Sequence, residues 1–157
     1  MNLLLKSPAA TRRLGLKLGA AIEPGDFIAL TGDLGAGKTV LVKAIAEGAK
    51  VPEPATSPTF ALVNVYRGGR VVLQHLDLYR LSGPAELFAL GFDDLVAEPA
   101  ATLCEWAERA GDALPAERLE IRLETTGPQE RRATFTAHGP RGRELRDAMS
   151  KGRVAET

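Results

Sequence analysis

The sequence lacks the features that mark several common classes of protein. It has one cysteine among 157 residues, which excludes an internal disulfide and a multi-cysteine metal site within the chain. That residue, Cys104, lies in an apolar run and is expected to be a core residue rather than a nucleophile. No apolar run reaches the roughly 18–20 residues that span a bilayer, and the opening segment MNLLLKSPAA is too short in apolar residues for a secretory signal. We therefore expect a cytoplasmic protein without membrane contact.

The chain also has no excess of positive or of negative charge. Twenty Lys and Arg residues balance twenty Asp and Glu residues, so no net field attracts nucleic acid, which argues against a direct RNA binder. The hydrophobic share of 45% is typical of a soluble globular protein, and the length suits one domain over residues 1–157. The segment at about 140–157 is expected to be a solvated C-terminal helix with a frayed end; a docking surface is the alternative.

The spacing of apolar residues predicts alternating helices and strands in the first third of the chain. Ser7 followed by Pro8 is typical of a helix start, and Leu14 and Leu18 recur at helical spacing, so a helix is expected over residues 8–21. A buried strand is expected in FIALTGD, and a second helix in TVLVKAIAEGA, directly after a cluster of glycines.

The rest of the chain is richer in strand-forming residues. The Gly-Gly pair in RGGR lies between the runs ALVNVY and VVLQHLDLYR, and it predicts an antiparallel hairpin with a two-residue turn. One or two short helices are expected in GPAELFALGFDDLV, a buried strand in ATLCEW, and a final strand pair in LEIRLET and RATFTAH. We therefore predict an α/β domain with a mixed sheet, parallel where helices cross over and antiparallel at the hairpin and the final pair.

The glycine cluster ends in a lysine and a threonine. Its segment GDLGAGKT matches the pattern G-x-x-x-x-G-K-[ST] at every position, between a predicted strand and a predicted helix. Glycines let the backbone form a concave nest of N–H groups, and the helix start adds free donors for phosphate. Lys38 is placed to reach the β- and γ-phosphates of a nucleotide, and the Thr39 hydroxyl to ligate Mg²⁺. The expected binding residues are Gly32, Asp33, Leu34, Gly35, Ala36, Gly37, Lys38 and Thr39; a glycine-rich turn that only starts a helix is the alternative.

Two carboxylates stand where a metal or an attacking water could be held. Asp77 ends the apolar run of HLDLYR, the usual position of a Walker B aspartate, although an aspartate can also simply end a hairpin strand. Glu105 follows the strand in ATLCEW, at the edge where open α/β sheets bind ligands, although such a glutamate is often only solvated.

Five further side chains are candidates for a switch or a partner contact. Ser57 and Thr59 flank a proline in SPTF, where hydroxyls either sense a γ-phosphate or form ordinary turn bonds. His75 and Tyr79 are expected to share the strand face of the aspartate in HLDLYR, because side chains alternate along a strand. Trp106 is the only tryptophan, and it either packs in the core or docks a partner.

The motifs GDLGAGKT, SPTF, HLDLYRL, LGFDDL and CEWAER, in this order, resemble the TsaE (YjeE) family from about residue 10 to 132. The resemblance implies a P-loop NTPase fold with an antiparallel insertion, ATP and Mg²⁺ as ligands, and weak intrinsic ATPase activity. It also implies a role in tRNA threonylcarbamoyladenosine synthesis, where TsaD with TsaB transfers threonylcarbamoyl to an adenosine. TsaE hydrolysis would support turnover of that pair, and tRNA would be met only through the complex.

The resemblance also implies roles for single residues. Asp77 corresponds to the family's Walker B-like aspartate and Glu105 to its metal-associated glutamate, which Trp106 follows. Thr11 and Arg132 correspond loosely to positions near the bound nucleotide. The chain departs from the family at two positions: Cys104 replaces the usual β-branched residue before the glutamate, and Ala107 replaces the usual proline after the tryptophan.

These residues suggest attack of water on the γ-phosphate, with Lys38 as a catalytic charge, Asp77 orienting the water, and the metal held by Thr39 and Glu105. A small-molecule kinase is a rival, because P-loop kinases share this size and fold. A nucleotide-gated assembly module that needs no hydrolysis is a second rival.

Overall fold

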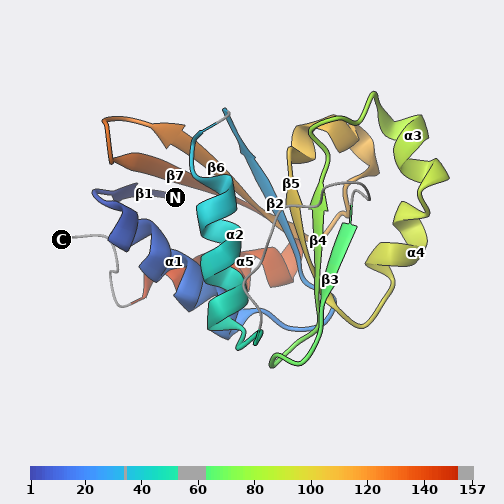
Figure 1. Cartoon of the computed structure of the whole chain (residues 1–157), viewed down its shortest axis with the longest axis horizontal. Helices are drawn as coiled ribbons and strands as arrows, with labels where there is room; N and C mark the ends of the chain where they lie inside the picture. Colours follow the sequence, from blue (N-terminus) through green and yellow to red (C-terminus); the bar gives the residue numbers. More distant parts are fainter. Residues whose placement is uncertain (34, 53–62, 152–157) are drawn as a thin grey trace.

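The computed structural model describes residues 1–33, 35–52 and 63–151, and its strands form one seven-stranded sheet in the order β1-β7-β6-β2-β5-β4-β3 (Figure 1). The strands are β1 (Asn2–Leu5), β2 (Phe27–Gly32), β3 (Val63–Tyr66), β4 (Leu73–Asp77), β5 (Ala101–Glu105), β6 (Arg118–Thr125) and β7 (Arg131–His138). The helices are α1 (Pro8–Ala21), α2 (Lys38–Gly48), α3 (Pro84–Ala89), α4 (Phe92–Val96), α5 (Gly139–Ser150) and the 3-10 helix η1 (Ala107–Ala113).

The predicted mixed sheet is confirmed. The four central strands β6, β2, β5 and β4 pair in parallel, while β3 on β4, β7 on β6 and β1 on β7 are antiparallel. Parallel pairing aligns the carboxyl ends of β2, β5 and β4 at one edge, and open α/β sheets bind their ligands at that edge.

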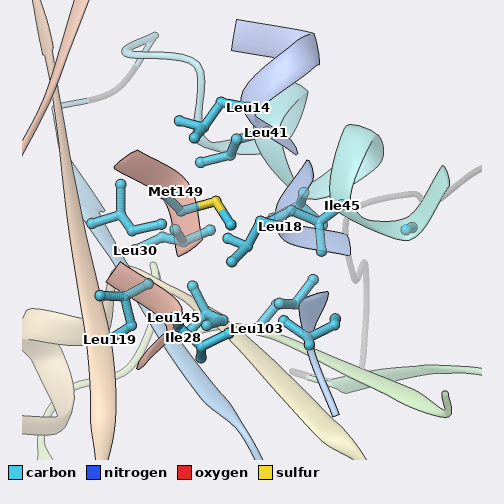
Figure 2. Packing of buried hydrophobic residues seen from close by; sticks show 14 of the residues in the cluster. Leu14, Leu18, Ile28, Leu30, Leu41, Ile45, Leu103, Leu119, Leu145 and Met149 are labelled. Atoms are coloured by element: carbon cyan, nitrogen blue, oxygen red, sulfur yellow. The ribbon is translucent and has the colours of Figure 1, made fainter. Parts of the chain in front are cut away.

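The two faces of the sheet carry separate apolar clusters. One cluster joins the sheet to α1, α2 and α5, and the other packs α3, α4 and η1 against β2, β4 and β5. Residues alternate between the two along β2, because Ile28 and Leu30 face the first and Phe27 and Ala29 the second. Figure 2 shows the first cluster, with Leu14, Leu18, Ile28, Leu30, Leu41, Ile45, Leu103, Leu119, Leu145 and Met149.

Helix α1 begins and ends as the sequence predicts, and it packs very closely on α2. The Ser7 hydroxyl accepts a hydrogen bond from the Ala10 amide at 3.2 Å, with Pro8 in the first turn. A Cβ added at Gly48 would lie 2.3 Å from the backbone oxygen of Leu16. Glycine at the end of α2 therefore permits a close backbone contact between α2 and α1.

The hairpin of β3 and β4 is antiparallel as predicted, but the predicted two-residue turn is wrong. Tyr66 pairs with Leu73, so residues 67–72 form the connection. The connection contacts the ends of two helices: the Arg70 amide donates to Ala49 O at 2.7 Å, and its guanidinium donates to Gly19 O at 2.8 Å. These bonds satisfy carbonyls at the helix ends.

The expected C-terminal helix is present as α5, but it is packed rather than solvated; residues 152–157, where a frayed end was expected, lie outside the described residues. Leu145 and Met149 of α5 are buried against the first cluster. Arg141 binds Asp26 with two hydrogen bonds of 2.8 Å, from Nε and Nη2 to the two carboxylate oxygens. Hydrogen bonding to Asp26 raises the pKa of Arg141, so the guanidinium keeps its charge, and the pair ties α5 to the residue before β2.

Strand β1 and helix η1 were not expected from the sequence. The four residues of β1 pair with β7, a contact between opposite ends of the chain that a local apolar pattern does not reveal. None of the helices within the described ranges combines the length and apolar character that a membrane crossing requires.

Replacing Arg141 by Ala should lower the free energy of unfolding by about 2–3 kcal/mol, because Asp26 is buried and would lose its cation. Urea unfolding measures this change. Arg143→Ala, an exposed position on the same helix, is the matched control and should stay within about 0.5 kcal/mol of the wild type. Equal losses in both variants would show that the ion pair does not hold α5.

Candidate functional site

The predicted phosphate loop connects β2 directly to α2. Gly32 has a φ of +132°, and a Cβ there would lie 2.3 Å from Leu123 O on the neighbouring strand β6. Gly37 has a φ of +99° and caps α2, with open space where a Cβ would stand. Glycine is needed at the first position for close approach and at the second for the left-handed backbone. Of the predicted loop residues, Leu34 lies outside the described part of the chain.

Lys38 is the first residue of α2 and its ammonium group is turned back into the loop. Nζ donates to Asp33 O at 3.0 Å and to Gly32 O, and it lies 4.0 Å from the centre of the Trp106 ring. Burial lowers the pKa of Lys38, while nearby carboxylates, Glu108 first, oppose that shift. The loop thus holds a partly desolvated cation beside its own carbonyl groups.

The carboxylate of Glu105 joins three elements at the sheet edge. Its Oε1 lies 3.3 Å from the Thr39 hydroxyl on α2, and its Oε2 lies 2.6 Å from Nε2 of His75 on β4. Glu105 and His75 are 2% and 1% exposed, so neither is a solvated strand end. The structure therefore brings together the two residues expected at the metal, and it adds the histidine as a third member.

Asp77 stands beside Glu105 at the end of the adjacent parallel strand, where the two residues are partners in the register. Its Oδ1 accepts a hydrogen bond from the Tyr79 amide at 3.0 Å, a contact that turns the chain after β4. Both carboxylates lie on the strand face that also carries α2. Asp77 is thus close to the loop, but its hydrogen bond is to the Tyr79 amide and not to Thr39 or His75, the partners of Glu105.

Aromatic side chains border the lysine on its outer side. The rings of Tyr79 and Trp106 are 5.0 Å apart, and the Arg109 guanidinium lies 5.7 Å from each ring centre. Trp106 has a φ of +56°, a left-handed backbone that is uncommon for a bulky residue. The two aromatic candidates therefore form one group with Lys38, and Arg109 is a member that the sequence reasoning did not single out.

The loose assignment of Arg132 to the nucleotide stays a prediction, but its neighbour Arg131 is the arginine that contacts the loop. Arg131 Nε donates to Ala36 O at 3.2 Å, and its Nη2 lies 3.5 Å from Gly35 O, whereas Arg132 is exposed. The alternation of side chains along the strand indicates that Arg131, rather than Arg132, faces the loop, because Arg131 shares a face with the buried Ala133.

A small cavity of about 110 Å³ adjoins the start of α2. Thr11 is buried at this cavity, which agrees with a position near the loop. Among the predicted switch residues, Ser57 and Thr59 lie outside the described residues. The cavity is lined by Pro8, Thr11, Gly37, Val40, Pro128, Gln129 and Arg131.

The oxygen atoms at the sheet edge fit a hard divalent cation. Within residues 1–33, 35–52 and 63–151, no group of three or more His, Cys, Asp or Glu side chains is arranged to hold a metal ion. Mg²⁺ in nucleotide sites is bound by one or two protein ligands together with phosphate oxygens and water. Thr39 Oγ1 and Glu105 Oε1, 3.3 Å apart, meet that requirement.

Comparison with known proteins agrees with this geometry. The family model described as "Threonylcarbamoyl adenosine biosynthesis protein TsaE" matches residues 5–133. The chain belongs to the TsaE family. The matched range includes the phosphate loop and both carboxylates, and it stops before α5.

Several TsaE proteins are similar over most of their length. The Bacillus subtilis tRNA threonylcarbamoyladenosine biosynthesis protein TsaE is 38% identical over 92% of this chain and 90% of its own. The Treponema pallidum protein of the same name is 37% identical over 85% of this chain and 98% of its own. The crystal structure of Bacillus subtilis YdiB matches with a TM-score of 0.81 and 34% identity, covering 96% of this chain and 94% of that one.

The thiol of Cys104 should be inert in the folded protein. It is fully buried on β5, and burial raises its pKa, with the charges of Asp77 and Glu105 adding to the shift. A raised pKa leaves little thiolate at pH 8, so a disulfide reagent should label no thiol in native protein and one thiol per chain in urea. Rapid labelling of the native protein would contradict the expectation that Cys104 is a core residue.

Proposed function

We propose that this chain binds ATP with Mg²⁺ and hydrolyses the ATP to support tRNA threonylcarbamoyladenosine synthesis. One observation carries the proposal: the glycine loop, Lys38 and Thr39 converge with the buried Glu105 at the carboxyl edge of the sheet. The names of the relatives support the pathway, because they are tRNA threonylcarbamoyladenosine biosynthesis proteins.

The loop would bind the phosphates through its amide groups, as the free N–H groups at the start of α2 carry partial positive charge. Lys38 would exchange its two backbone carbonyl acceptors for phosphate oxygens, which carry full negative charge. Thr39 and Glu105 would hold Mg²⁺, which neutralises charge on the phosphates when it is bound.

The apolar and polar walls of the small cavity suit a nucleotide base and its sugar. Val40 is 49% exposed there, although its side chain is apolar, and Thr11 and Gln129 supply polar atoms. The cavity adjoins Gly37, so a base in this position would be continuous with phosphates in the loop. Arg131 would act indirectly, by holding loop carbonyls in place.

Hydrolysis would proceed by attack of a water molecule on the γ-phosphorus, with ADP as the leaving group. Asp77 is the group best placed to orient that water, since it lies next to Glu105 and retains an oxygen besides the one bound by the Tyr79 amide. Lys38 would stabilise the charge that develops on the phosphate oxygens. We expect weak activity in the isolated protein and faster turnover with partners.

The partners in this proposal are TsaD and TsaB, as the family resemblance implies. Hydrolysis would drive a conformational or release step in their complex, and tRNA would be contacted only through that complex. The balanced charge of the chain agrees with this indirect contact. The reaction would take place in the cytoplasm.

Replacing Lys38 by Ala should weaken ATP binding by about 10- to 100-fold, the usual value of a hydrogen bond to a charged group. Calorimetry measures the affinity, and Trp106 fluorescence gives a second readout because Lys38 leaves the ring when it binds phosphate. Lys43→Ala, which removes the same charge from an exposed site on α2, is the control and should bind normally. Equal affinity in both variants would exclude phosphate binding by Lys38.

Reconstituted tRNA modification tests the pathway role. With TsaD and TsaB alone, we expect about one product per complex, and with this protein and ATP we expect many. Asp77→Ala should bind ATP but give slow hydrolysis and little turnover. Full turnover by a variant that does not hydrolyse ATP would support the nucleotide-gated module instead, and phosphate found on a metabolite would support a kinase.

A further inference from the structure

His75 is buried inside the site, and this position does not agree with a partner contact. Its side chain is 1% exposed, on a strand covered by β3 on one side and β5 on the other. Its Nε2 atom lies 2.6 Å from Glu105 Oε2, and the Tyr66 ring lies 6.3 Å from its own ring with a tilt of 31°. The ring is therefore held in place and directed at a single carboxylate.

We infer that His75 is a positioning residue that orients the Glu105 carboxylate toward Thr39 and thereby sets the affinity of the site for Mg²⁺. The inference rests on the proposed function, because it concerns the metal that accompanies ATP. It assigns His75 no contact with substrate or metal.

The geometry of Glu105 shows why its carboxylate needs such a partner. A glutamate side chain has three rotatable bonds, and a free carboxylate turns easily about the last one. The hydrogen bond from His75 fixes Oε2, which leaves Oε1 on the side of Thr39, 3.3 Å away. A ligand pair held in advance loses less entropy when it binds a metal ion, so the histidine bond favours binding.

The hydrogen-bond partners of the two ring nitrogens agree with this role. Within the described residues, Nδ1 of His75 is buried and has no hydrogen-bond partner. A proton on Nδ1 would leave a buried donor unsatisfied, whereas a proton on Nε2 is used in the bond to Glu105. The hydrogen-bond geometry therefore favours a hydrogen on Nε2, from which the ring donates to the carboxylate.

The parallel register explains how the histidine reaches the glutamate. His75 pairs with Leu103, two residues before Glu105, and Asp77 pairs with Glu105 itself. The imidazole thus crosses diagonally between strands on the face that carries α2, while Asp77 occupies the direct neighbouring position. The diagonal contact leaves Asp77 free for a different role.

Metal affinity in the ADP complex tests the inference without relying on turnover. Mn²⁺ binding to the protein with ADP is measured by electron paramagnetic resonance, and ADP affinity is measured by calorimetry in EDTA and in Mg²⁺. For His75→Leu we expect the metal affinity to fall about 10- to 100-fold, with ADP affinity in EDTA within about 2-fold of wild type. For His75→Gln, whose amide nitrogen takes the place of Nε2, we expect recovery of most of the loss.

Two controls separate positioning from general damage. Gln74 is the preceding residue, is also buried, and accepts a hydrogen bond from Thr102 on the neighbouring strand. Its replacement in Gln74→Leu should leave the metal affinity unchanged. In a Glu105→Gln background, His75→Leu should cause no further loss, because the histidine acts through that carboxylate.

The outcomes distinguish the two proposals. Wild-type metal affinity in His75→Leu would overturn the inference and leave ATP binding intact. Equal loss of ADP binding with and without metal would also overturn it, as would an undiminished effect in the Glu105→Gln background. If His75→Leu does not fold, the comparison of His75→Gln with His75→Asn tests the inference. The asparagine side chain is shorter, so His75→Asn should lose the hydrogen bond to Glu105 and with it the metal affinity. Absence of ADP binding by the wild type would instead overturn the proposed function.

Discussion

The parallel register of three strands is the constraint on which the site depends. Leu30 of β2 and Asp77 of β4 both pair with Glu105 of β5, so β4 and β5 end at the same height and β2 continues past them to Gly32. The glycine loop leaves β2 two residues after Leu30, and the first turn of α2 then brings the Thr39 hydroxyl to 3.3 Å from Glu105 Oε1. A slip of one residue in β5 would turn Glu105 to the other face, because side chains alternate along a strand.

This register places an ionisable cluster where water is largely excluded. Glu105 is buried with His75 on one oxygen and Thr39 near the other, and the Lys38 ammonium is satisfied by backbone carbonyls and the Trp106 ring. Buried charges are costly unless they are paired and hydrogen-bonded, and each of these has such partners. In the proposed function, a nucleotide with its metal would engage Thr39 and Lys38, and each would then exchange its present contact for one with the ligand.

Much of the fold follows from local sequence, and the exceptions share one cause. The helix over residues 8–21, the glycine loop and the central strands carry strong periodicity or a cap, so sequence alone predicts them. Strand β1 and the long connection after Tyr66 depend on contacts with distant segments, which local patterns do not encode. The role of Arg70 at two helix ends is of the same kind.

The site also contains residues that the sequence predicts and residues that it does not. Lys38, Thr39, Asp77 and Glu105 were placed by motif and strand position, and the structure brings them to one edge. The bond from His75 to Glu105 was missed because it crosses between strands, and pairing of β4 with β5 was not deduced from sequence. Arg131 was missed although alternation with Ala133 and Phe135 places it on the helix-covered face.

A crystal structure with a non-hydrolysable ATP analogue and Mg²⁺ tests the central claim most directly. The account predicts the β-phosphate within the loop between Gly32 and Lys38, the Lys38 ammonium moved from the loop carbonyls to phosphate oxygens, and the metal beside Thr39 and Glu105. An analogue bound away from this edge, or a metal that touches neither residue, would contradict it.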